Sequence, residues 1–360
     1  MLGLMFRVSI FGESHGHGIG VLIEGCPPGI KVNEEIINNE LKKRRPGSLY
    51  TSPRREEDKA KILSGVFNDY TTGAPIVIFI PNRDVDSSFY EKIRNIPRPG
   101  HADYTARIKY FGFNDYRGGG IFSGRITAGL VAAGAVAKAF LSKFNIEIYS
   151  YVVKIGPIEV SIDFSSGEDL RKAIDESPVK CPDSRASKVM EEYISRVIET
   201  GDSIGGIVET IVYNVPPGLG EPPIDTLDGD LAKALFAIPG VKGVEFGAGF
   251  KLATMHGSEA NDEWTISKGK IVTKTNNAGG INGGISNGMP IVFRVVFKPT
   301  PTIRKPQKSI DLITGKPVAI KGEGRHDPCI AIRGAPVVEA VTSIVLSDHI
   351  LRWLAWKNLH

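Results

Sequence analysis

Two histidines lie in glycine-flanked loops, and each has the chemistry of an acid or base that works near neutral pH. His15 lies in GESHGHG (12–18) and His101 in RPGHADY (98–104). A positioned imidazole transfers protons at this pH, although an isolated loop histidine is more often only solvated. The glycine flanks and nearby arginines favour a catalytic role. His15 and His17 could also ligate a metal, but no third ligand occurs at a sensible spacing, so we expect no metal site.

Arginines cluster around these loops, and their planar forks suit phosphate and carboxylate groups. The formal net charge is only +4, from 44 basic and 40 acidic residues. Clustering at so low a net charge favours small polyanionic ligands over nucleic acid. Asp327, in RHDPCIAIRG (325–334), lies between such cations, where an ordinary salt bridge or a turn is the alternative role. The clustered arginines are Arg44, Arg45, Arg54, Arg55, Arg98, Arg107, Arg117, Arg125, Arg325 and Arg333.

A triple glycine, Gly118 to Gly120, precedes a small, apolar stretch at 126–140 that predicts a buried helix. Without side chains, the backbone there can approach a ligand closely or adopt positive φ. Ser123 and Arg125 lie at the junction. A glycine-rich turn that leads into a helix N-terminus is suited to bind an anion, because free N–H groups and the helix dipole point toward it.

The elements that must position these groups mix strands and helices without strict alternation, which favours an α+β fold. Expected strands cover 6–11, 20–24, 76–80, 149–160, 207–213 and 291–297. Expected helices cover 33–45, 126–140, 185–199 and 227–238, with a last one that has Pro336 near its first turn and ends near Trp353.

An internal similarity aligns 12–30 with 201–219 without gaps, matching glycine, serine and Pro-Pro-Gly positions. A predicted helix that ends in Pro-Gly follows each copy. We therefore expect one pseudo-symmetric domain over 1–360, with related halves at about 1–150 and 190–350. Chance recurrence of turn residues is the alternative.

The composition indicates a cytoplasmic, soluble globular protein. Three widely spaced cysteines argue against a disulfide framework. The N-terminus lacks the pattern of a secretory signal, and we expect no apolar run that approaches the length of a membrane span.

A set of motifs in this order resembles the chorismate synthase family over essentially the whole chain. The motifs are FGESHGHGIG, KRRPG with YTSPRRE, RPGHADY, YRGGGIFSGRITAG, GDSIGG, VKGVEFGAGF, NNAGGINGGISNG, FKPTPTI and GRHDPCIAIR. The resemblance implies helices sandwiched between antiparallel β-sheets, assembled as a homotetramer. It also implies a lyase of the shikimate pathway, in aromatic amino acid biosynthesis. Its reaction is the anti-1,4-elimination of phosphate from 5-enolpyruvylshikimate 3-phosphate, which gives chorismate with the assistance of reduced FMN and no net redox change.

The resemblance also assigns roles to residues. His15 would act at the departing phosphate, His101 at the flavin N1 locus, and Asp327 in proton movement near flavin N5. Substrate anions would bind Ser14, Arg44, Arg45, Arg125 and Arg333. FMN contacts would be Ile121, Phe122, Ser123, Gly283, Lys298, Pro299, Thr300, Pro301, Thr302 and Arg325.

Some positions depart from the family pattern. Lys43 replaces the first of three arginines before Pro-Gly, and Leu49 stands where many members have arginine. Pro239-Gly240 replaces the Asn-Ala turn at a flavin contact, and Ile126 replaces a glutamate. The first two changes leave open whether NADPH (the NADP cofactor) binds, and we expect an external flavin reductase to supply reduced FMN. A flavin-binding or nucleic-acid-binding protein that has lost catalysis is the rival hypothesis, against which His15, His101 and Asp327 argue.

Overall fold

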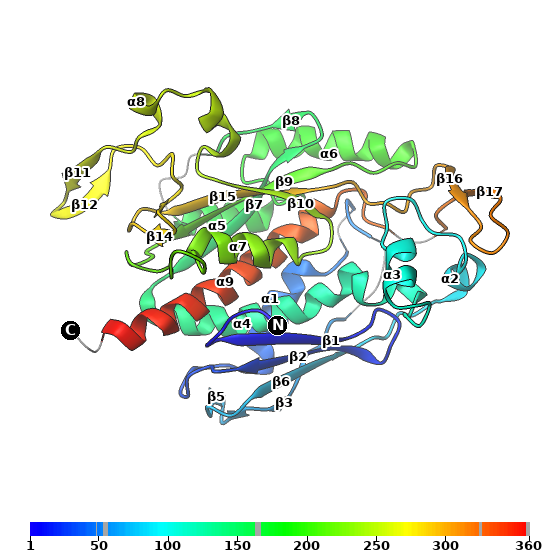
Figure 1. Ribbon diagram of the computed structural model, residues 1–360, viewed down its shortest axis with the longest axis horizontal. Helices are drawn as coiled ribbons and strands as arrows, with labels where there is room; N and C mark the ends of the chain where they lie inside the picture. Colours follow the sequence, from blue (N-terminus) through cyan, green and yellow to red (C-terminus); the bar gives the residue numbers. More distant parts are fainter. Residues whose placement is uncertain (48, 53–56, 163–166, 324–325, 358–360) are drawn as a thin grey trace.

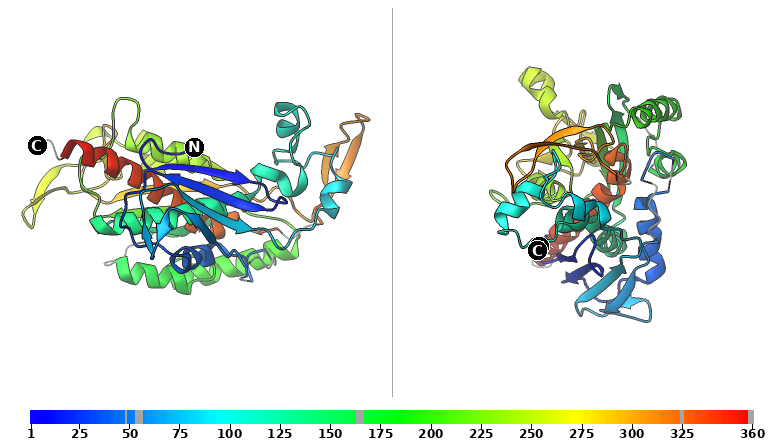
Figure 2. Two further views of the ribbon diagram at one scale, coloured as in Figure 1. Left: turned by 90° about the horizontal axis from the view of Figure 1, so that it is seen from below. Right: turned by 90° about the vertical axis from the view of Figure 1, so that its right-hand side faces the viewer.

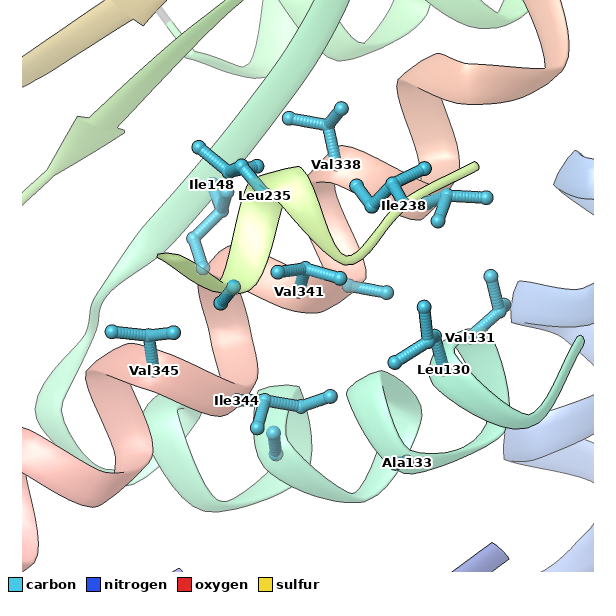
Figure 3. Packing of buried hydrophobic residues seen from close by; sticks show 14 of the residues in the cluster. Leu130, Val131, Ala133, Ile148, Leu235, Ile238, Val338, Val341, Ile344 and Val345 are labelled. Carbon is cyan, nitrogen blue, oxygen red and sulfur yellow. The ribbon is translucent and has the colours of Figure 1, made fainter. Parts of the chain in front are cut away.

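Two apolar helices, α4 (Thr127–Leu141) and α9 (Ile330–Lys357), pack against each other at the centre of the computed structural model. The structure describes residues 1–47, 49–52, 57–162, 167–323 and 326–357. A Cβ at Gly134 of α4 would lie 2.4 Å from the Cβ of Ala340 of α9, so the helices approach as closely as glycine permits. Figure 3 shows Leu130 of α4, Leu235 of α7 (Leu227–Phe236) and Ile344 of α9 in this core.

An antiparallel sheet covers the α4 side of the helices, with strand order β1-β2-β6-β3. Its strands are β1 (Arg7–Gly12), β2 (Gly18–Glu24), β6 (Ile76–Pro81) and β3 (Lys61–Ser64). Alternate residues of β6, including Ile76, Ile78 and Ile80, are fully buried against the helices. This period of two is the pattern of a sheet with one covered face.

A second antiparallel sheet covers the α9 side, with strand order β10-β15-β9-β7-β8. The strands are β7 (Glu147–Ile155), β8 (Ile158–Glu159), β9 (Gly206–Tyr213), β10 (Val241–Phe246) and β15 (Ile291–Phe297). Tyr149, Tyr151 and Val153 point to the other face, where they pack on α5 (Gly167–Glu176). The α+β fold with helices between antiparallel sheets is thus confirmed.

Shorter elements surround this frame. The described helices also include α1 (Glu34–Arg44), α2 (Ser88–Lys92), α3 (Asp103–Lys109), α6 (Ser184–Glu199), α8 (Gly257–Ala260) and 3₁₀ turns at Arg117–Phe122, Gly124–Ile126, Ser142–Phe144 and Gly249–Thr254. Two-stranded hairpins pair β4 (Val66–Phe67) with β5 (Tyr70–Thr71), β11 (Trp264–Ser267) with β12 (Lys270–Thr273), β13 (Ile281–Asn282) with β14 (Ile285–Ser286), and β16 (Gln307–Ile310) with β17 (Pro317–Ile320). The β11–β12 and β16–β17 hairpins project from opposite ends of the molecule (Figure 2).

Two element predictions are wrong in detail. The strand predicted over 149–160 is divided into β7 and β8 by a turn at Gly156, whose φ is +55°. The last helix begins at Ile330, so Pro336 lies inside it and not near its first turn. An internal proline costs about 3 kcal/mol or more. Burial of nearly every residue from Ala331 to Ile350 offsets that cost.

Two helical stretches, Gly124–Phe144 and Ile330–Lys357, are long and apolar enough to cross a membrane by length and composition. The expectation that no run approaches that length is therefore wrong. Their most apolar windows are 72% and 89% buried inside the protein. Packing in the core between the two sheets accounts for their apolar composition.

Candidate active site

A cavity of about 610 Å³ opens where β15 ends and α4 and α9 begin. Its volume lies in the range of small-molecule sites, about 300–1,000 Å³. Most of the site residues predicted from the sequence line it. They are His101, Asp327, Arg44, Arg125, Arg333, Ile121, Phe122, Ser123, Lys298, Thr300, Pro301 and Thr302.

Two arginines share one buried carboxylate at the wall of this cavity. Arg44 NH1 lies 3.0 Å from Asp58 Oδ2, and Arg125 NH1 binds Asp58 Oδ1. Burial raises the pKa of Asp58, but Arg44 and Arg125 outweigh burial, and the net pKa lies below its usual value. Burial, and then Arg333, lower the pKa of Arg44 to about 9 against the opposing effect of Asp58. The guanidinium of Arg44 therefore remains charged at neutral pH.

A second ion pair joins Arg333 of α9 to Asp327. Arg333 NH1 lies 2.8 Å from Asp327 Oδ2, and Arg333 Nε donates to the carbonyl of Arg44 at 2.9 Å. Asp327 Oδ1 accepts the backbone N–H of Ser52 at 2.7 Å. Asp327 thus lines the cavity and also forms the salt bridge considered as its alternative role. These contacts tie α9 to the end of α1, which brings three arginines that are far apart in sequence to one cavity.

The triple glycine passes directly over both histidines. Gly118 and Gly119 have φ of +60° and +86°. A Cβ on Gly118 would lie 2.3 Å from His15 Cδ2, and a Cβ on Gly119 would lie 2.8 Å from His101 Cε1. Glycine is therefore required here by both backbone conformation and space.

An aspartate orients His101. His101 Nδ1 lies 2.7 Å from Asp103 Oδ1, and Arg98 NH2 is 3.0 Å from the same nitrogen and 2.7 Å from the same carboxylate oxygen. A carboxylate only accepts, so the shorter contact, to Asp103, assigns the imidazole N–H to Nδ1. Nδ1 then has no lone pair for Arg98, which donates to Asp103 Oδ1 instead. Burial raises the pKa of Asp103, but the bonds from Arg98 and His101 hold it well below its usual value.

A tyrosine lies between the two histidine environments. The ring of Tyr90 meets His15 edge-on at 5.2 Å between centroids, and the guanidinium of Arg98 lies 5.2 Å from the same ring. His15 Nδ1 is 2.8 Å from Ser87 Oγ. His15 is itself buried, below the glycine turn, and it is not part of the cavity lining.

Other predicted residues do not line the cavity. Ser14 is buried beneath Gly118, Arg45 donates to the carbonyl of Asp58 at 3.2 Å, and Pro299 packs on Gly205. Gly283 lies between β13 and β14, so the structure does not bring it to the site. Arg325 falls outside the described residues, as do Arg54 and Arg55.

Sequence reasoning missed part of the cavity wall. The missed lining residues include Ser52, Tyr90, Lys242, His326, Ile330, Val337 and the turn from Phe236 to Val241. Most are apolar or single polar residues without a motif of their own. The Pro239-Gly240 turn was the available signal, because it stands where the family has a flavin contact.

Known proteins that resemble this chain agree with each other. The chorismate synthase family model matches residues 6–351. A chorismate synthase from Aeropyrum pernix is 56% identical over 350 residues, covering 97% of this chain and 92% of that protein. One from Thermococcus kodakarensis is 51% identical over 359 residues, covering 100% of this chain and 99% of that protein. A crystal structure of a chorismate synthase matches with a TM-score of 0.78 at 36% identity, over 98% of this chain and 93% of that one. A full-length match in sequence and in fold, with a cation-lined cavity at the motif residues, places this chain in the chorismate synthase family of enzymes.

Proposed function

We propose that this protein catalyses the anti-1,4-elimination of phosphate from 5-enolpyruvylshikimate 3-phosphate to give chorismate, assisted by reduced FMN that is not consumed. One observation carries the proposal: Arg44, Arg125 and Arg333 face one cavity, next to two histidines under a glycine turn. The family identity supports the same reaction. In it, the bond from carbon to the phosphate oxygen breaks and its electron pair leaves with the phosphate, while a proton leaves the ring. The electron pair from that C–H bond forms one double bond, and the pair of the existing ring double bond shifts by one bond to form the second.

The cations fit the anionic groups of the substrate. The three guanidiniums pair with only two carboxylates, Asp58 and Asp327, so the cavity wall keeps a net positive charge. Lys298 and Lys242 also line the cavity, where burial, followed by Lys242, lowers the pKa of Lys298. The substrate carries a phosphate and two carboxylates, for which bidentate arginines are the usual partners.

The cavity also fits a flavin mononucleotide. An apolar wall of Ile121, Phe122, Ile238 and Val337 would hold the ring system, and Lys298 with Thr300 and Thr302 would hold the phosphate. Gly118 and Gly119 keep side-chain volume out of the turn beside this wall. When bound in its reduced form, FMN would supply electron density that assists departure of the phosphate.

The titratable residues lie at defined places around the cavity. His15, a short distance below the glycine turn, would carry the proton that neutralises charge on the departing phosphate. The imidazole of His101, oriented by Asp103, would present its other nitrogen toward the cavity. Asp327, held by Arg333 and by the N–H of Ser52, would assist removal of the ring proton.

We also propose the wider setting that the family resemblance implies. The protein would be a cytoplasmic homotetramer that receives reduced FMN from an external reductase, with no nucleic-acid or membrane partner.

An anaerobic turnover assay tests the proposal. The enzyme, 5-enolpyruvylshikimate 3-phosphate and dithionite-reduced FMN should yield chorismate and phosphate in equal amounts while the flavin stays reduced. Oxidised FMN should give no turnover. Oxidation of one flavin per chorismate, or full activity with oxidised FMN, would overturn the reaction proposed. Ligand binding without any turnover would favour the rival, a binding protein that has lost catalysis.

A further inference from the structure

The side chain of Asn82 holds the loop that carries His15. Asn82 directly follows β6, and its Nδ2 lies 3.0 Å from the carbonyl oxygen of Glu13, 3.0 Å from that of Ser14 and 2.9 Å from that of Gly16. Its backbone N–H also donates to the carbonyl of His17 at 3.1 Å. The carbonyls on both sides of His15 are therefore fixed by one residue.

The other end of the same amide binds a cavity arginine. Arg125 Nε donates to Asn82 Oδ1 at 2.8 Å. Carbonyl oxygens only accept and a guanidinium only donates, so only one orientation of the amide satisfies every contact. Arg125 in turn binds Asp58, which also holds Arg44. One half-buried amide thus connects the histidine loop to the buried cations.

We propose that Asn82 is a positioning residue for the reaction, which keeps the loop that carries His15, beneath the cavity-lining Gly118, in register with Arg125 in the cavity wall. This inference rests on the proposed function. The geometry requires an amide: a carboxylate would place negative charge against three carbonyl oxygens, and a leucine would make no hydrogen bond. A misplacement of about 1 Å in such a site can lower turnover by about 10².

Two variants distinguish the role of the Asn82 Nδ2 donor from that of its Oδ1 acceptor. Asn82→Asp keeps an acceptor for Arg125 and loses the donors to the loop, whereas Asn82→Leu loses both. Both should lower kcat by about 10², and Asn82→Leu should also raise the KM for the substrate more than Asn82→Asp does. Asn82→Gln keeps both donors and the acceptor and should recover part of the lost kcat. Equal KM values for the Asp and Leu variants would contradict the role of Oδ1.

A double-mutant cycle distinguishes positioning from a merely structural role. In a His15→Ala background, Asn82→Asp should lower kcat by less than about threefold, because residues that act as a unit are not additive. Asn214→Asp is the matched control: it removes an amide-to-carbonyl bond, from Asn214 Nδ2 to Asn145 at 2.9 Å, and should leave kcat unchanged. If Asn82→Asp lowered kcat by about 10² in the His15→Ala background as well, the two effects would be additive and the proposal would be overturned.

Amide hydrogen exchange tests the tether without any turnover. The backbone amide protons of residues 12–18 should exchange about tenfold faster in Asn82→Asp, an increase that corresponds roughly to the loss of one hydrogen bond. In Asn214→Asp, their exchange rates should stay unchanged. Unchanged exchange at 12–18 in Asn82→Asp would overturn the tether. If the wild type shows no turnover, the proposed function fails, and the exchange measurement still decides whether Asn82 holds the loop.

Discussion

The two halves of the chain share one topology and differ in what they place at the cavity. The first half runs β1, β2, α1, β3, β6, α4, and the second runs β7, β9, α7, β10, β15, α9, apart from additional elements that include α5 and α6 between β7 and β9. The corresponding sheet orders are β1-β2-β6-β3 and β7-β9-β15-β10. As the internal repeat predicts, β2 in 12–30 aligns with β9 in 201–219, and one helix follows each segment, α1 in the first half and α7 in the second. The division at 1–150 and 190–350 stays a prediction.

Equivalent positions carry different chemistry. The last helical residue is Arg44 in α1 and Phe236 in α7, and both line the cavity. His15 of the first loop corresponds to Ile204 of the second, whose N–H donates to the carbonyl of Pro328 at 2.9 Å. The next residue back, Ser203, donates to the carbonyl of Thr300 at 2.7 Å. The second loop therefore shapes the backbone of the cavity wall, while the first supplies a titratable group.

The largest difference between the halves should appear in turnover. His15→Ala and His101→Ala should each lower kcat by about 10²–10⁴, the scale of one positioned acid or base. Ile204→Val, at the position equivalent to His15, should leave kcat unchanged, and His17→Ala should be mild. Anaerobic steady-state assays measure all four variants. A His17→Ala variant as damaged as His15→Ala would show that the wrong histidine of the loop was chosen.

The regular elements and the charged half of the site could be predicted from sequence, for a physical reason. Asn33 caps α1 as its sequence indicates, and 291–297 is a strand as predicted, because local periodicity and caps determine both. The apolar wall could not be found in this way. Ile238 and Val337 are ordinary core residues in sequence, and only the pairing of α7 with α9 brings them to the cavity.

Asn82 and Asp58 were missed for a related reason. Each is a single polar residue next to an element, and such residues usually occupy turns. Their roles depend on partners 43 and 67 residues away. A sequence pattern within one loop contains no information about such partners.

The second largest effect concerns the buried carboxylate of the first half. Asp58→Asn should lower the free energy of unfolding by about 3–5 kcal/mol at neutral pH, because it leaves two guanidiniums without their anion. Asparagine tolerates the φ of +44° at this position. The folded pKa of Asp58 is lowered, so its stabilisation is present above about pH 4 and is lost as pH falls through the folded pKa.

Urea unfolding at several pH values measures this difference. The gap between wild type and Asp58→Asn should be constant from neutral pH down to about pH 4 and should narrow below it. A gap that widened on acidification would contradict the assigned direction of the pKa.

A smaller effect compares glycines with positive φ in the two halves. Gly119→Ala and Gly201→Ala should each lose about 1–2 kcal/mol of stability, since alanine is strained in the left-handed region. The added Cβ at Gly119 would also lie 2.8 Å from His101 Cε1, whereas that at Gly201 would lie 3.1 Å from the Cβ of Arg304. Only Gly119→Ala should therefore lower kcat, by about tenfold or more. Equal kcat values for the two variants would show that the glycine turn does not contribute to turnover.

The smallest effect is expected at the acidic residue that begins each loop, where the halves should respond in opposite directions. Asp202 binds Lys305 at 2.8 Å, and this bond lowers its pKa. Its counterpart Glu13 has a raised pKa, because of burial and then the neighbouring Asp115. A carboxyl group whose pKa is lowered on folding stabilises the fold above about pH 4, while one whose pKa is raised stabilises it only below the folded value.

At pH 7, Asp202→Asn should thus lower the urea midpoint of unfolding and Glu13→Gln should raise it. Both groups are partly solvated, so each change should stay below about 1 kcal/mol, and the Asp202 effect should fade in high salt because exposed pairs are screened. Midpoints that move in the same direction for both variants would show that the two loops differ in sequence but not in electrostatic environment.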